Sequence, residues 1–349
     1  MERKEYASLD ILKFVMAILI VSIHVGPFLS ISRPADFLLN QTISRTAVPC
    51  FFTISGFLLF SKLENIEDKK VYFKAYIERI IKIYMIWTAI YIPAFIIEFY
   101  FNSVRFNAID CVLTLAHDIL VKGIYRLWYL HALVIGAYIV YMLKYRLKLC
   151  NYGILGITGG WYAIGVLTTS WSGAFYGFPL FKCATVQTLT NAYLFVFETT
   201  RNGFFFGSFF IAIGMLIINC ETNIAKKRYF LRTILWYVVL VFEAYLLHQR
   251  EWSTDYSMMF ALVPVTYYLI RLVLLLDCKN IGVAKHLRNL STLVYLVHPL
   301  LILFLSFVGV YSGEFNSICV FCIVLFATLA LSECLICASK KYRWIKSFY

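Results

Sequence analysis

Residues 10–24 read Asp10-Ile-Leu-Lys13-Phe-Val-Met-Ala-Ile-Leu-Ile-Val-Ser-Ile-His24, an apolar run that contains one lysine and ends on a histidine. Lys13 and His24 are eleven residues apart, and eleven steps of 100° return a helix to within about 20° of its starting face after a rise of roughly 16 Å. The two side chains are therefore predicted to share one helix face, with Asp10 beside Lys13 at one end. Because ionisable groups are costly in lipid, this face is expected to point into the protein or into a wet cavity.

The composition of the chain predicts that this helix belongs to a membrane protein. Of 349 residues, 61% are apolar and 15% are charged, whereas soluble domains are about half apolar and a quarter charged. The apolar stretches are long enough to cross about 30 Å of hydrocarbon as helices, and the period-2 alternation of a membrane barrel is absent. We therefore predict an all-α, polytopic transmembrane helical bundle of about ten spans. The expected spans are residues 11–29, 47–60, 80–99, 127–143, 152–168, 203–219, 231–247, 258–276, 290–311 and 316–338.

The basic residues indicate how the bundle is oriented. One set of alternate connections carries 22 Lys and Arg and the other set carries 8, and Lys13 and Arg271 inside spans complete the total of 32. Basic residues concentrate on the cytoplasmic side of membrane proteins, so we predict that both termini are cytoplasmic. The net charge of +13 then reflects topology, and binding of nucleic acid is not expected because the charges are spread over several short loops.

The chain is expected to form one integral membrane domain over residues 1–349, since no Pro/Gly/Ser-rich linker or charged tract divides it. Two longer connections, residues 102–126 and 169–202, are expected on the outer side, where long ordered loops often place binding groups. The cysteine pairs Cys319/Cys322 and Cys334/Cys337 have the spacing of zinc ligands. Both pairs lie inside the last expected span, four turns apart, so they cannot close one tetrahedral site and we expect no metal.

His24 is the expected catalytic base. Imidazole has an unperturbed pKa near working pH, so a histidine held in a cavity can take a proton from a hydroxyl and return it later. The alternative is a histidine that only hydrogen-bonds a neighbouring helix. Lys13 on the same face favours the functional interpretation.

A basic pair opens the third expected span. Arg79 and Lys82 are three residues apart, so they share a helix face at the cytoplasmic boundary, where they could bind the phosphates of a cytosolic donor. The alternative is that both side chains only extend to the lipid headgroups of the inner leaflet.

Three stretches together carry a family resemblance: Lys13 and His24 with ten residues between them, Arg45-Thr-Ala-Val-Pro49-Cys-Phe-Phe-Thr-Ile-Ser55-Gly56-Phe57, and Leu293-Val-Tyr295-Leu-Val-His298-Pro299. In order and spacing they resemble the acyltransferase-3 family of ten-helix membrane O-acyltransferases. The resemblance implies a multi-pass protein of the bacterial inner membrane that moves an acyl group, acetyl above all, from cytoplasmic acyl-CoA to a hydroxyl of an extracytoplasmic or membrane-associated acceptor such as a cell-envelope carbohydrate.

The resemblance also implies roles for individual residues. His24 would be the catalytic base assisted by Lys13, and Arg79 and Lys82 would bind the acyl-CoA donor. The family usually has Arg at the position of Lys82 and often at that of Lys13. In this chain the ammonium group of lysine, a single point charge, stands where the family has a planar guanidinium group that can form two parallel hydrogen bonds.

Other motifs resemble a narrower branch, the membrane half of the serine racemases of vancomycin-resistance operons. They are Ser170-Trp171-Ser-Gly173, Thr200-Arg201-Asn202-Gly203-Phe204-Phe205-Phe206, Glu243-Ala-Tyr245-Leu-Leu-His248 and Asp255-Tyr-Ser257-Met258. That half is thought to move L-serine, so the alternative function is a membrane transporter or binding module for a small amino acid such as L-serine.

Polar residues at the outer ends of the expected spans are candidates to bind the acceptor: Arg201, Asn202, Glu243 and His248, with Asp255 nearby. The alternative for each is a solvated residue at the membrane rim. Glu243 lies about one turn inside its span, so we expect it to pair with Arg201 or Lys182.

Two further groups have a structural interpretation. We interpret Trp128, Tyr129 and His131 as an interfacial aromatic belt rather than a site. His298 before Pro299 is expected to mark a kink in its helix or to satisfy a backbone hydrogen-bonding group of that helix. The alternative is contact with substrate.

Overall fold

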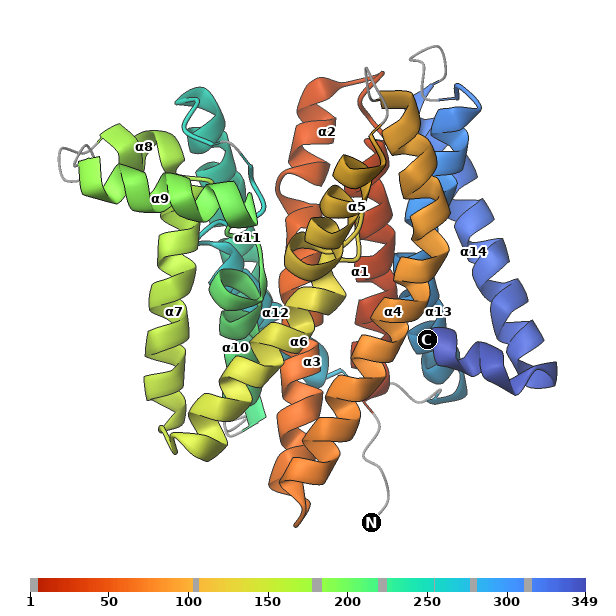
Figure 1. The fold of residues 1–349 in the computed structure, drawn as a ribbon. Helices are drawn as coiled ribbons and strands as arrows, with labels where there is room; N and C mark the ends of the chain where they lie inside the picture. Colours follow the sequence, from red (N-terminus) through yellow and green to blue (C-terminus); the bar gives the residue numbers. More distant parts are fainter. Residues whose placement is uncertain are drawn as a thin grey trace.

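The computed structural model describes residues 6–102, 107–177, 184–218, 225–253, 255–276, 281–310 and 316–349, and this part of the chain is helical without a strand. Figure 1 shows the helices packed side by side as a bundle. The α-helices are α1 (Ala7–Val25), α2 (Arg33–Asn40), α3 (Ala47–Glu64), α4 (Lys69–Asn102), α5 (Ala108–His117), α6 (Trp128–Tyr141), α7 (Asn151–Thr168), α8 (Ser172–Gly177), α9 (Ala184–Phe197), α10 (Ser208–Ile218), α11 (Lys226–Gln249), α12 (Leu262–Leu274), α13 (Ile281–Phe307) and α14 (Ser317–Lys341). Short 3₁₀ or π segments are η1 (Ile43–Thr46), η2 (Asp118–Lys122), η3 (Met142–Arg146), η5 (Gly203–Gly207) and η6 (Arg343–Phe348).

Each of the ten stretches expected to span a membrane overlaps a helix of the structure. Six helical stretches of the described chain are long and apolar enough to cross a membrane: Ala7–Val25, Arg33–Glu64, Lys69–Phe101, Lys226–Gln249, Gly282–Phe307 and Ser317–Lys341. The all-α membrane fold predicted from the sequence is thus confirmed. The count of ten crossings and the cytoplasmic side of the termini stay predictions.

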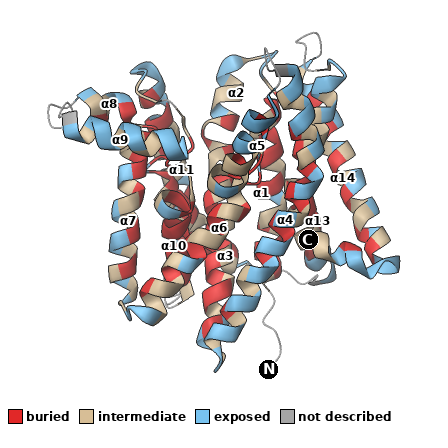
Figure 2. Ribbon diagram, viewed as in Figure 1, coloured by how far each residue is buried: buried red, intermediate tan, exposed pale blue. Residues whose placement is uncertain are grey.

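The most extensive helix packing is that of α3 against α10 and of α1 against α13, with α1 also packed on α3, and Figure 2 shows buried residues along α1, α3 and α10. Two glycines allow α3 and α10 to approach closely. A Cβ at Gly56 would clash with the Ile211 carbonyl oxygen, and one at Gly214 would clash with that of Thr53. Helices in lipid have no hydrophobic driving force to associate. Small residues at a crossing let the two backbones approach, and the close van der Waals packing stabilises the contact.

The helix that carries Lys13 and His24 is central in the bundle. α1 packs against α3 and α13, and it ends at Gly26, whose φ of 67° is the left-handed conformation that terminates many helices. α1 and α4 both start at the lower end of Figure 1, the end that also carries the turn between α3 and α4. α8 and α9 lie across the opposite end. Residues 169–202, expected as one long loop, therefore contain two helices.

Candidate functional site

Lys13 and His24 line one cavity of about 290 Å³, as their spacing along one helix face predicted. The cavity is enclosed by side chains from α1, η1, α3, α4, α6, α13 and the segments before η5 and α12. We refer to its two ends as the Lys13 end and the His24 end. Five Lys or Arg line it and, among its described lining residues, none is acidic; the five are Lys13, Arg45, Arg79, Arg126 and Arg201.

At the Lys13 end, the expected pair with Asp10 is present. The Lys13 Nζ lies 3.2 Å from Asp10 Oδ1, and Arg288 of α13 lies 3.8 Å from Asp10 Oδ2. The carboxylate of Asp10 is shared between two cations, so it fixes α1 against α13 at this end. Both Asp10 and the Lys13 side chain are largely shielded from solvent, with exposed fractions of 10% and 14%.

Arg79 lines the same cavity and Lys82 does not. The Arg79 guanidinium donates to the Tyr349 carbonyl oxygen at 3.5 Å, and Tyr349 also lines the cavity. Lys82 is exposed on α4. Arg79 and Lys82 are neighbours on α4, about 60° apart around its axis, and the cavity reaches the first side chain but not the second. Donor binding by either residue stays a prediction.

At the His24 end, the imidazole of His24 stacks on that of His298. Their ring centroids are 5.5 Å apart and the planes differ by 18°. His298 is fully buried, and its Nδ1 lies 2.9 Å from the Val294 carbonyl oxygen, one turn back along α13. A carbonyl only accepts, so Nδ1 carries the hydrogen and Nε2 presents a lone pair. His298 Nε2 is buried and has no hydrogen-bond partner among the described residues.

Three arginines surround the His24 end. Arg45 comes from η1, Arg126 precedes α6, and Arg201 precedes η5. All three are close enough to His24 to interact with it electrostatically. The carboxylate of Asp255 lies between two of them, 3.5 Å from Arg45 and 3.4 Å from Arg201.

Asp255 is held in place by its own loop. The Ser257 amide donates to Oδ1 at 3.0 Å and the Ser257 hydroxyl donates to Oδ2 at 2.7 Å. Burial opposes ionisation of this carboxyl, but Arg45, Arg201 and the Ser257 hydrogen bonds together hold its pKa below the usual value. Asp255 is therefore a fixed anion beside a cationic cavity end.

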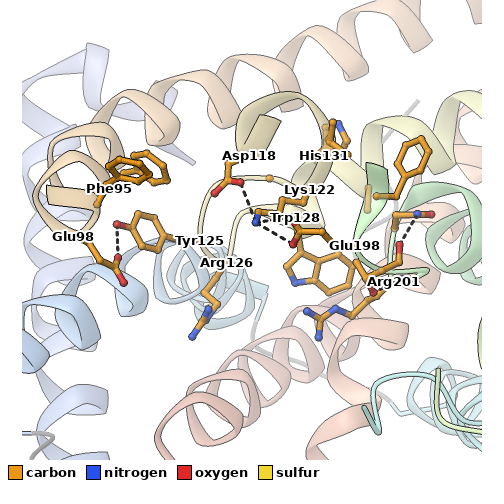
Figure 3. Close-up of a pocket in the computed structure, with 17 residues that line it drawn as sticks. Phe95, Glu98, Asp118, Lys122, Tyr125, Arg126, Trp128, His131, Glu198 and Arg201 are labelled. Atoms are coloured by element: carbon orange, nitrogen blue, oxygen red, sulfur yellow. Dashed lines mark hydrogen bonds and ion pairs between the residues drawn. The ribbon is translucent and has the colours of Figure 1, made fainter. Parts of the chain in front are cut away.

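A second, larger cavity of about 650 Å³ adjoins the His24 end (Figure 3). Arg126, Trp128 and Arg201 line both cavities, so the two meet at these side chains. The remaining charged residues of this outer cavity carry both signs: Glu98, Asp118, Lys122 and Glu198. Lys122 Nζ lies 3.0 Å from Asp118 and 3.1 Å from Glu198, and these carboxylates hold the pKa of Lys122 above its usual value against the opposing effect of burial.

Of the other residues predicted to bind the acceptor, Asn202 lines a cavity and His248 does not. Asn202 lines the outer cavity and caps η5, since its Oδ1 accepts from the amides of Phe204 and Phe205. His248 is exposed at the end of α11, near Phe37 and Tyr256, and lines neither cavity.

Glu243 has different partners from those expected. Its carboxylate accepts from the Trp171 indole at 2.8 Å and from the amides of Phe260 and Ala261 at 2.9 and 2.8 Å. Arg201 pairs with Asp255 instead, and Lys182, the alternative partner, lies outside the described residues. Backbone amides just before α12 point at this carboxylate because the first N–H groups of a helix have no partner within it.

Trp128 and Tyr129 face the cavities, whereas we expected an aromatic belt at the membrane surface. Tyr129 lies 3.2 Å from the Ser55 hydroxyl of α3, and the Tyr295 hydroxyl donates to the Arg126 carbonyl at 2.7 Å. These contacts turn the start of α6 inward. Arg126 was missed by the sequence reasoning, although its position just before two aromatic residues at a helix start was a usable signal.

Comparison with known proteins gives a family match over most of the chain. Residues 6–337 match the acyltransferase domain of the acyltransferase-3 type. The chain is 28% identical over 298 residues to a serine/alanine racemase of Enterococcus gallinarum, which covers 83% of this chain and 40% of the relative. It is 27% identical over 345 residues to an amino-acid racemase of Enterococcus faecalis, which covers 96% of this chain and 46% of the relative. The chain thus spans less than half the length of these relatives, and no solved structure matches it.

Proposed function

This chain belongs to the acyltransferase-3 family, and from that premise we propose that it transfers an acyl group, acetyl in the simplest case, from cytoplasmic acyl-CoA to a hydroxyl of an extracytoplasmic acceptor such as a cell-envelope carbohydrate. The observation that carries the proposal is the position of His24. Its imidazole lines a cavity that has Lys13 and Arg79 toward one end and adjoins the outer cavity at the other. A base in this position can meet a donor and an acceptor that arrive from opposite sides.

His24 would act as a general base. Its ring takes the proton of the acceptor hydroxyl as the oxygen attacks the thioester carbonyl carbon, and the new C–O bond forms. The C–S bond then breaks, and the departing thiolate of CoA takes the proton back from His24. A positioned base of this kind contributes about 10²–10⁴-fold to a rate.

The donor would enter at the Lys13 end. Arg79 lines the cavity and is also exposed, so its guanidinium can bind phosphate through two parallel hydrogen bonds. Lys13 lies deeper on the same side and is already paired with Asp10. We assign Arg79 to the phosphates of CoA, with Lys82 a more peripheral contact on the exposed face of α4.

The acceptor would bind in the outer cavity. Aromatic rings of Phe95, Tyr125 and Trp128 and the carboxylates of Glu98 and Glu198 line it. Rings offer apolar faces and carboxylates accept hydrogen bonds from hydroxyl groups, a combination suited to a carbohydrate. The Tyr125 hydroxyl already donates to Glu98 at 2.9 Å, so one carboxylate is held in a fixed orientation (Figure 3).

The test is loss of the thioester of acetyl-CoA on purified, membrane-reconstituted protein supplied with cell-envelope carbohydrate. His24→Ala should lower the rate by at least about 10²-fold while the melting temperature changes little. His286→Ala is a matched control, because His286 is an exposed histidine of α13 that lines neither cavity. A His24→Ala protein with the wild-type rate would remove His24 from the mechanism.

A second function, transport or binding of a small amino acid such as L-serine, is favoured by the mixed charges of the outer cavity and by the names of the two Enterococcus racemases. An ammonium group could meet Glu98 or Glu198 while a carboxylate meets Arg201. Uptake of labelled L-serine into vesicles, measured beside acetyl-CoA turnover, separates the two functions. Serine uptake without thioester loss would favour transport.

A further inference from the structure

Residues 343–349 cross from α14 back to α4. α14 ends at Lys341, and Tyr342 has an extended backbone with φ −110° and ψ 98°, so the chain leaves the helix there and continues into η6. Figure 1 shows this stretch running from the lower end of α14 to the C label. It packs on both α14 and α4. We call residues 343–349 the strap.

Hydrogen bonds fix the strap to both helices. On α4, the Trp87 indole donates to the Phe348 carbonyl oxygen at 2.9 Å, and the two rings meet edge to face with their centroids 6.1 Å apart. On α14, the hydroxyl oxygens of Ser339 and Tyr349 are 2.8 Å apart, so one hydroxyl donates to the other. Phe348 and Tyr349 stay partly exposed, and segments with exposed backbone and limited burial open more readily than a buried core does.

The strap also reaches the candidate site. Tyr349 lines the inner cavity, which is the cavity of about 290 Å³ that holds Lys13 and His24. The Tyr349 carbonyl oxygen accepts a hydrogen bond from the Arg79 guanidinium at 3.5 Å. Arg79 is the residue that the proposed function assigns to the phosphates of CoA. The strap therefore engages the side chain that the donor needs.

A phosphate group is a stronger partner for Arg79 than this carbonyl is. The bond to Tyr349 is longer than the usual range of about 2.7–3.2 Å, and its acceptor is neutral. A phosphate is charged and can accept two parallel hydrogen bonds from one guanidinium. Because Tyr349 and Arg79 line the same cavity, a phosphate that binds Arg79 there competes with the strap. Displacing the strap then lowers the apparent affinity for the donor, since only the open fraction of the protein binds it.

We propose that the strap is an autoinhibitory element, which holds Arg79 through Tyr349 in the absence of donor and is displaced when acyl-CoA binds. The inference rests on the proposed acyl transfer and adds regulation of its donor site. The opposite arrangement is a fixed wall that helps to hold the donor. It predicts the reverse effect, because loosening such a wall would weaken donor binding.

The experiment measures binding of CoA by calorimetry to the purified full chain in lipid nanodiscs. Trp87→Phe keeps an aromatic ring but removes the indole donor to the strap. Ser339→Ala removes the hydroxyl that fixes the strap to α14, and it covers the case in which Trp87→Phe folds poorly. Ser347→Ala is the matched control, because the Ser347 hydroxyl donates to a carbonyl within the strap itself.

CoA should bind roughly 2- to 10-fold more tightly to Trp87→Phe and Ser339→Ala than to wild type, and equally to Ser347→Ala and wild type. In wild type, hydrogen–deuterium exchange of the peptide 342–349 should become faster when CoA is added. The strap is overturned by an absence of CoA binding, by weaker or unchanged binding in both anchor variants, or by exchange that CoA leaves unchanged or slows.

Acetyl-CoA turnover is measured separately, so that the two proposals fail in different ways. Tighter CoA binding and release of the strap without turnover reject acyl transfer alone. Turnover with a strap that CoA does not release rejects autoinhibition alone.

Discussion

The rings of His24 and His298 stack at 5.5 Å across the contact between α1 and α13. His298 is tied to the Val294 carbonyl of its own helix, so its ring provides a fixed surface against which the ring of His24 is oriented. The site therefore depends on a histidine pair from helices at opposite ends of the sequence. The prediction that His298 hydrogen-bonds within its own helix is confirmed, and the same ring also stacks on His24.

His298→Phe should keep a flat ring against His24 but lose the hydrogen bond that fixes its orientation. We expect kcat for acetyl-CoA turnover to fall by up to about 10²-fold with little change in the KM for acetyl-CoA, because a positioning residue alters geometry rather than donor binding. Steady-state kinetics together with a thermal melt check this. An unchanged kcat in a folded variant would show that the stack has no role in turnover.

Arg79→Gln should raise the KM for acyl-CoA more than Lys82→Gln does. Arg79 lines the cavity and Lys82 is exposed outside it. A lost charge-assisted hydrogen bond to phosphate costs about 1.5–3 kcal/mol, or roughly 10- to 100-fold in KM. Donor titrations of both single variants and the double variant test this order, and an equal effect of the two single changes would contradict it.

Glu243→Ala should lower the thermal stability of the protein. The change leaves the Trp171 indole and the amides of Phe260 and Ala261 without their acceptor, and each buried donor left unsatisfied costs about 1–3 kcal/mol. Glu243→Gln keeps one acceptor oxygen and should be intermediate. If melts of both variants match wild type while acceptor KM rises, the earlier prediction of Glu243 as an acceptor ligand is favoured instead.

Asp255 should make stability depend on pH at the acidic end. Its pKa is lowered in the folded protein, so its stabilising effect is complete above the unfolded value of about 3.9 and is lost as the pH falls through the lower folded value. The melting temperatures of wild type and Asp255→Asn should therefore differ at pH 6 and converge below about pH 4. Asp110→Asn, at an exposed position of α5, is the control. A difference that is constant with pH would exclude ionisation of Asp255 as its origin.

Tags should report opposite sides of the membrane at the two ends of the bundle. A tag between α3 and α4 and one after Tyr349 are expected in the cytoplasm, and a tag within residues 169–202 is expected outside, because the 22 basic residues lie on one side. Accessibility to a membrane-impermeant reagent in intact cells distinguishes the sides. A cytoplasmic signal from residues 169–202 would reverse the proposed donor and acceptor sides.

The sequence by itself determined the features that depend on composition and on one helix at a time. The apolar stretches fixed an all-α membrane fold, and the eleven-residue spacing of Lys13 and His24 put both on one face because helical geometry is local. The same reasoning paired Asp10 with Lys13, as the 3.2 Å contact confirms.

Only the tertiary structure decided which residues from different helices meet. The rotation of each helix about its own axis is set by packing, such as the close approach of Gly56 and Gly214, and this rotation leaves no periodic mark in the sequence. It turned Trp128 inward, left Lys82 outside the cavity, gave Glu243 a set of backbone donors, and brought Arg45 and Arg201 to one Asp255. Long-range packing therefore assembled the cationic end of the cavity around His24, whose place on α1 the sequence had already indicated.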